Sequence, residues 1–213
     1  GKSYNIGGDC ELSNLSVVKR ICKILNDVHP KKNGKYEDLI NYVNDRPGHD
    51  FRYSTDITKI NNDIGWKPIT NFDEGLKKTV LCTSMLEIID KNYDEEIPDS
   101  DTYDTLKSVM IYFNQNNVNL NNAFYYFILH FLKNSGYDIL RAKKHPTILR
   151  FQSKNPNILS DLNEIFELDF HKMKKSEHVT NYDKKIMTKF MSELVRYHFP
   201  DVKSFKVAKD LFN

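Results

Sequence analysis

The sequence predicts a mixed α+β protein: a small α/β segment over residues 1–80 and an α-helical bundle over residues 81–213. In the first part, short apolar runs that favour strands alternate with helical patterns and with turn signals rich in glycine and proline. In the second part, apolar residues recur every three to four positions over long stretches, and strand signals fade. The change of pattern places the domain boundary near residue 80.

Two short strands and one helix are predicted near the start of the chain. Ser3–Ile6 is a strand-type run closed by the turn residues Gly7 and Gly8. Ser13 is a suitable N-cap for a helix that should stop before the His29-Pro30 pair. The second predicted strand is Leu39–Val43.

The rest of the first part should form a loop and two helices. Residues 45–50 form the loop, because Pro47 lacks an amide donor and Gly48 allows a tight bend. A short helix capped near Asp56 should end at Gly65. The pair Thr70 and Asp73 predicts the cap of the next helix.

Beyond residue 80 the apolar positions form stripes at helical spacing. The first predicted stripe contains Tyr103, Leu106, Met110 and Phe113. A stronger one, ending at Ser135-Gly136, contains Leu120, Phe124, Phe127, Ile128 and Phe131. An irregular basic stretch is predicted over residues 141–154, and two further helices are predicted around Leu162–Leu168 and Tyr182–Tyr197.

The net charge of +2, from 31 Lys+Arg against 29 Asp+Glu, argues neither for nor against a polyanionic partner. The charge is unevenly distributed, because residues 83–140 carry 3 basic and 9 acidic side chains while residues 141–213 carry 15 and 9. The basic second half could contact phosphates, or it could be an ordinary solvated helical surface.

Cysteine usage and hydropathy indicate a cytoplasmic protein without a membrane partner. The three cysteines, Cys10, Cys22 and Cys82, form no CxxC pair, which excludes a disulfide framework and a zinc ribbon. No apolar run reaches the roughly 18 residues that a membrane span requires. The histidines show no HxxxH spacing, so no metal site is expected. A chain that begins at Gly1 is expected to be an internal fragment.

Three segments of the first part carry a family resemblance. They are YNIGG at residues 4–8, DRPGHD at 45–50 followed by Arg52-Tyr53, and IGWKP at 64–68. In this order and spacing, residues 3–80 resemble the C-terminal, substrate-binding end of a dTDP-glucose 4,6-dehydratase, an extended short-chain dehydrogenase/reductase. The resemblance implies that Arg46 and His49 lie at the nucleotide-diphosphate end of a dTDP-sugar, with Asn14 contributing.

The residues for the chemistry of that family are missing. The resemblance implies NAD for an intact dehydratase, yet no GxGxxG turn for a pyrophosphate occurs in this sequence. No cofactor is therefore expected in this chain. Tyr103 and Lys107 match a YxxxK catalytic pair by spacing, but they lie outside the matching part. No catalytic residue is assigned, and a lyase inactive by itself is expected.

The helical part resembles the C-terminal helical domain of RecO-type recombination mediators. The matching stretches are residues 81–87, residues 124–137 and the closing residues 196–212. This resemblance implies DNA repair, with single-stranded DNA or repair proteins as partners. Basic side chains flanked by Tyr137 and Phe151 could combine phosphate contacts with base stacking. These candidates are Lys143, Lys144, Arg150 and Lys154.

Three interpretations remain open at this point. The chain is a sugar-nucleotide-binding segment with a helical extension, a DNA-repair module, or an artificial or mis-assembled fusion without an integrated function. The first is the leading interpretation, because the Arg46 loop lies in its family context. Two truncated resemblances that meet near residue 80 support the third.

Overall fold

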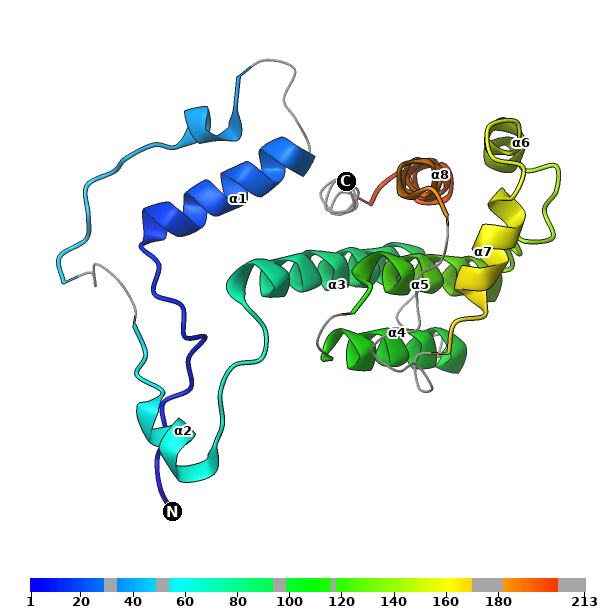
Figure 1. Cartoon of the computed structure of the whole chain (residues 1–213). Helices are drawn as coiled ribbons and strands as arrows, with labels where there is room; N and C mark the ends of the chain where they lie inside the picture. Colours follow the sequence, from blue (N-terminus) through cyan, green and yellow to red (C-terminus); the bar gives the residue numbers. More distant parts are fainter. Residues whose placement is uncertain (29–33, 49–53, 94–98, 116–117, 170–181, 203–213) are drawn as a thin grey trace. The chain divides into compact units, whose positions relative to one another are not determined.

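The structure is a computed structural model that describes residues 1–28, 34–48, 54–93, 99–115, 118–169 and 182–202, with the backbone alone for 24–28. Contacts divide the chain into two compact units, Gly1–Lys77 and Lys78–Asn213. Within the described ranges the regular elements are helices (Figure 1): α1 Asn14–Val28, η1 Tyr36–Leu39, α2 Thr58–Ile64, α3 Phe72–Asn92, α4 Ser100–Phe113, α5 Leu120–Asn134, α6 Pro146–Gln152, α7 Ile158–Phe166 and α8 Lys184–His198.

The predicted α+β class is wrong, because no β-strand occurs in the described part of the chain. Ser3–Ile6 has no regular structure, and Leu39–Val43 begins in the 3₁₀ helix η1 and continues without regular structure. Tyr42 and Val43 are 80% and 86% exposed. β-Branched and aromatic residues favour a strand only where a neighbouring strand accepts the backbone hydrogen bonds, and the described residues provide no such neighbour.

Helix α1 begins as predicted at Ser13. The Ser13 hydroxyl accepts a hydrogen bond from the Ser16 amide at 3.2 Å, which satisfies an otherwise unpaired helix donor. Further along α1, the Arg20 guanidinium forms an ion pair with Asp73 at 3.0 Å and lies 5.8 Å from the centre of the Phe72 ring. These contacts join α1 to the first turn of α3 within the first unit.

The boundaries of α2 agree with the prediction, and the cap of α3 corrects it. Asp56 accepts from the Thr58 amide at 2.8 Å, and Gly65 ends α2 in the left-handed conformation at φ 70°. At α3 the capping residue is Asn71, whose side-chain oxygen accepts from the Glu74 amide at 2.9 Å. Thr70 is wrong as the cap because Asn71 is the residue directly before the first helical turn.

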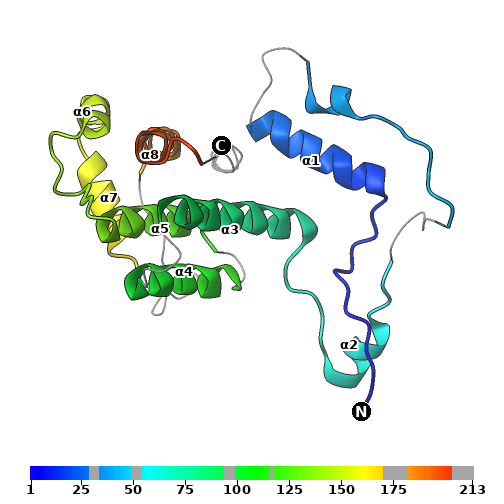
Figure 2. The ribbon, with the colours of Figure 1, turned by 180° about the vertical axis from the view of Figure 1, so that it is seen from behind.

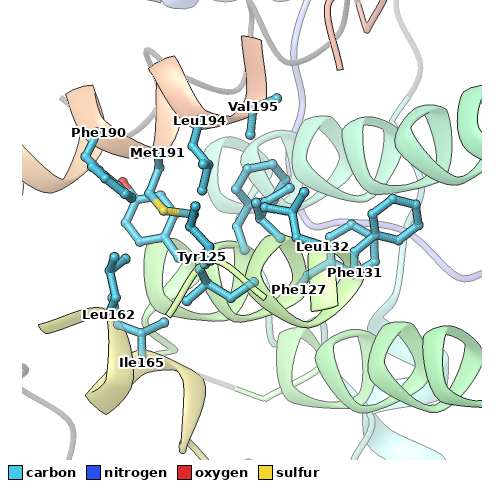
Figure 3. Close-up of a cluster of buried hydrophobic side chains, with 14 of the residues drawn as sticks. Tyr125, Phe127, Phe131, Leu132, Leu162, Ile165, Phe190, Met191, Leu194 and Val195 are labelled. Atoms are coloured by element: carbon cyan, nitrogen blue, oxygen red, sulfur yellow. The ribbon is translucent and has the colours of Figure 1, made fainter. Parts of the chain in front are cut away.

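The second unit is built around α5, whose apolar stripe was predicted. Its buried side chains meet those of α7 and α8, as the close-up of Leu162, Ile165, Phe190 and Leu194 shows (Figure 3). Helix α4 runs beside α5, and this neighbourhood is visible from both sides of the unit (Figures 1 and 2). The buried residues of α5 are Asn122, Ala123, Phe124, Tyr125, Phe127, Ile128, Leu129, Phe131 and Leu132.

Aromatic rings fill the centre of this core. Phe131 is fully buried and meets Tyr93 edge-on at a centroid distance of 5.4 Å. The same ring lies 5.7 Å from Phe127 and 5.5 Å from Phe199. Edge-to-face and offset arrangements are the favoured geometries for such rings, so Phe131 joins α5 to the end of α3 and to the segment after α8.

The predicted stripe on α4 is confirmed at two of its four positions, because Phe113 is buried and Leu106 packs against the core. The other two, Tyr103 and Met110, are 62% and 38% exposed. The buried face includes Thr102, Thr105 and Val109 in their place. The threonines can be buried because their hydroxyls are satisfied; that of Thr105, for example, donates to a main-chain oxygen at 2.7 Å. A stripe chosen by hydrophobicity alone is therefore rotated by about one residue around α4 relative to the face that is buried.

The stretch 141–154, predicted to be irregular, contains α6. His145 accepts from the Thr147 amide through Nδ1 at 3.2 Å, and Pro146 occupies the first helical turn, where its missing amide costs nothing. The two later predicted helices correspond to α7 and α8, each displaced by a few residues. A search of the described helices found none long and apolar enough to cross a membrane.

Candidate functional site

The structure brings together two of the three family-like segments around α2. The Tyr4 hydroxyl donates to Asp63 at 3.1 Å, and Lys59 donates to the main-chain oxygen of Ser3 at 2.8 Å. A β-carbon on Gly7 would lie 2.7 Å from the β-carbon of Thr55, so only glycine fits this close approach. The YNIGG segment is thus positioned by the helix that leads into IGWKP.

The Arg46 loop is built by a local turn. The Asp45 carboxylate accepts from the Arg46 amide at 2.9 Å, and the following Pro47-Gly48 turn places Gly48 at φ 74°, a conformation that glycine adopts readily. The Arg46 side chain is exposed. Its guanidinium has no hydrogen-bond or ion-pair partner among the described residues.

The other two predicted ligand residues are not joined to Arg46. Asn14 is the first residue of α1 and is exposed, and no hydrogen bond connects it with Arg46 in the described part of the chain. His49 lies outside the described residues, as do Asp50, Arg52 and Tyr53. That Arg46, His49 and Asn14 bind one ligand together therefore stays a prediction.

The YxxxK match does not form a proton-transfer site. Tyr103 and Lys107 lie on α4, with the Lys107 ammonium 5.8 Å from the centre of the tyrosine ring. The lysine lies near the ring, where a cation–π contact forms, and the ring is 62% exposed. Within the described ranges, no group of three or more side chains of metal-ligating type is close enough to hold an ion.

The predicted nucleic-acid residues divide into two groups. Lys143, Lys144 and Lys154 are exposed, whereas Arg150 forms an ion pair with Glu193 at 2.9 Å. Phe151 cannot stack on a base, because it is 4% exposed and its ring meets Phe190 edge-on at 5.5 Å. The expected pairing of aromatic and basic side chains is therefore wrong at this position.

Sequence reasoning missed a groove between α6 and α8, of about 460 Å³. Beside it the Nε2 atoms of His145 and His198 lie 3.2 Å apart, and burial lowers the pKa of both imidazoles. The contributing residues are more than forty positions apart in the sequence, so no local motif could identify the groove. This α6/α8 groove is lined by Pro146, Thr147, Arg150, Glu193, Arg196 and Tyr197.

Comparison with known proteins defines the first unit. Residues 1–79 match the family model described as GDP-mannose 4,6 dehydratase, so this part of the chain is similar to that family. Among curated proteins it is 53% identical over 83 residues to a dTDP-glucose 4,6-dehydratase of Haemophilus influenzae. The corresponding enzymes of Neisseria gonorrhoeae and Escherichia coli are 53% and 49% identical over 83 residues. Residues 1–79 are a partial dTDP-glucose 4,6-dehydratase-like segment.

The match has a limited reach. It covers 38% of this chain, and the chain spans about a quarter of the length of these relatives. The family match ends inside α3, which runs on to Asn92. No solved structure matches the chain at a significant level. The comparisons give no support to the RecO-type resemblance of residues 81–213.

Proposed function

We propose that residues 1–79 bind the nucleotide-diphosphate end of a dTDP-sugar and that Arg46 supplies the main phosphate contact. The observation that carries this proposal is the match of the whole segment to dTDP-glucose 4,6-dehydratases at about 50% identity. The exposed guanidinium of Arg46, free of described partners, is consistent with it.

The chemistry of arginine supports this role. A guanidinium presents a planar fork of N–H donors that matches two phosphate oxygens at once, whereas lysine offers only a point charge. The Pro47-Gly48 turn limits the conformations of the loop before binding, and this reduces the entropy that binding must overcome. Asn14 and His49 are proposed as further contacts to the same ligand.

The proposal concerns binding and not catalysis. An isolated segment that spans a quarter of its relatives provides one part of a substrate site. Affinity should therefore be in the millimolar range, roughly 4 kcal/mol of binding free energy, as one or two charge-assisted contacts would provide. We also propose that residues 1–80 and 81–213 act as separate domains, which the division into two compact units supports.

Isothermal titration calorimetry of the full chain with dTDP and with dTDP-glucose tests the binding role. The wild-type protein should bind both at millimolar concentration, and Arg46→Ala should weaken this binding. Arg46→Lys should recover only part of it, because the bidentate geometry is missing. Arg141→Ala is the matched control, since Arg141 is an exposed arginine of the other unit. Equal binding by the wild-type protein and Arg46→Ala would refute the role of Arg46.

A further inference from the structure

We propose that the α6/α8 groove is a binding site for a nucleoside monophosphate. The groove belongs to the second unit and shares no residue with the proposed dTDP-sugar site, so neither site depends on the other. Its volume of about 460 Å³ is within the range of small-ligand pockets. Its residues offer a phosphate-binding end and an aromatic face.

The phosphate-binding end is made by two arginines. Arg196 is exposed in the last turn of α8 and has no ion-pair partner among the described residues. Arg150 projects from α6 and pairs with Glu193 at 2.9 Å while staying 63% exposed. Two guanidinium groups and one carboxylate give the lining an excess of one positive charge. An exposed ion pair of this kind is weak, so Arg150 can add donors to a phosphate that Arg196 binds.

The aromatic face is the ring of Tyr197, which is 59% exposed. The rings of His145 and His198 lie 4.8 and 5.1 Å from it in T-shaped arrangements, which limit the motion of the tyrosine ring. Stacking of a base on an exposed tyrosine is a common contribution to nucleotide binding and does not require a particular base.

Positive charge next to the groove favours the approach of such a ligand. Lys143 and Lys144 come directly before His145 and Pro146 and are exposed. Their ammonium groups have no hydrogen-bond or ion-pair partner in the described part of the chain. A local excess of positive charge raises the concentration and the association rate of a phosphorylated ligand.

Ligand-observed NMR with the full chain tests the proposal, using dTMP, thymidine and inorganic phosphate as probes. We expect dTMP to bind about tenfold more tightly than either thymidine or phosphate, because only dTMP uses both ends of the groove. Arg196→Ala should weaken dTMP binding about tenfold, whereas the control Arg141→Ala should not change it. The same comparisons made in an Arg46→Ala background should give the same result, which separates this site from the proposed dTDP-sugar site, because dTMP carries part of that site's ligand.

A variant that should bind more tightly distinguishes loss of a contact from misfolding. Glu193→Gln removes the negative charge of the groove and should tighten dTMP binding several-fold, an effect that damage to the fold would not produce. Absence of dTMP binding at 10 mM, or equal weakening by Arg196→Ala and Arg141→Ala, would overturn the proposal. A ten-nucleotide single strand that binds more than a hundredfold more tightly than dTMP would identify a nucleic acid as the occupant and would also overturn it.

Discussion

Replacing Phe131 by alanine should destabilise the second unit far more than replacing Tyr103. Phe131 is fully buried, and its ring lies within 5.4–5.7 Å of Tyr93, Phe127 and Phe199. Loss of such a ring costs about 4 kcal/mol, from the lost burial and from the cavity that remains. Tyr103 is 62% exposed, so Tyr103→Ala should cost less than about 1 kcal/mol.

Urea denaturation followed by circular dichroism at 222 nm measures both changes. With a denaturant slope of about 2 kcal/mol per molar urea, the midpoint should fall by about 2 M for Phe131→Ala and by less than about 0.5 M for Tyr103→Ala. Ile165→Val removes one methylene from another fully buried side chain and should cost about 1 kcal/mol, which gives an intermediate reference. Equal shifts for Phe131→Ala and Tyr103→Ala would show that the assignment of the core face is wrong.

Two further predictions concern the cap of α3 and the histidines. Asn71→Ala should speed amide hydrogen exchange at Glu74 and cost about 1 kcal/mol of helix stability, while Thr70→Ala should leave Glu74 unchanged; the reverse order would make Thr70 the cap. Burial is the main cause that lowers the pKa of His130, His145 and His198, so below pH of about 6.5 the unfolded chain binds more protons than the folded one. The free energy of unfolding should therefore be level above pH of about 7 and should fall as the pH drops through about 6.5 toward the lowered folded values. Stability that rises on acidification across this range would contradict the burial of these imidazoles.

Local signals predicted the helices well where neighbouring residues decide the outcome. Ser13, Asp56 and Gly65 have the side chain or the backbone freedom that a helix end requires, and each lies at the expected end. The stripe from Leu120 to Phe131 is apolar enough that α5 must be buried against several helices.

The errors occurred where the outcome depends on residues distant in the sequence. Leu39–Val43 has the composition of a strand, but strand propensity is realised only beside another strand. On α4 the buried Thr102 could not be distinguished from an exposed threonine, because its hydroxyl contacts Tyr93 and Asn134, which lie outside the helix.

The candidate sites show the same difference. Arg46 could be proposed from the sequence because the surrounding motif is contiguous and lies within residues 1–79, which match a family. Arg196 and Tyr197 were missed, because the residues that make them part of a groove lie on α6, more than forty positions earlier. A family resemblance can therefore point to one loop, whereas a groove between two helices distant in the sequence becomes visible only in the three-dimensional structure.

A titration of the isotope-labelled full chain with dTDP-glucose, followed by two-dimensional ¹H–¹⁵N NMR, tests the binding role of the first unit most directly. The proposed function predicts saturable shifts of the Asp45, Arg46 and Gly48 amides at millimolar ligand, and their weakening in Arg46→Ala. Residues of the α6/α8 groove, among them Arg196 and Tyr197, have amide signals of their own. Shifts confined to those signals would contradict a dTDP-sugar site in residues 1–79.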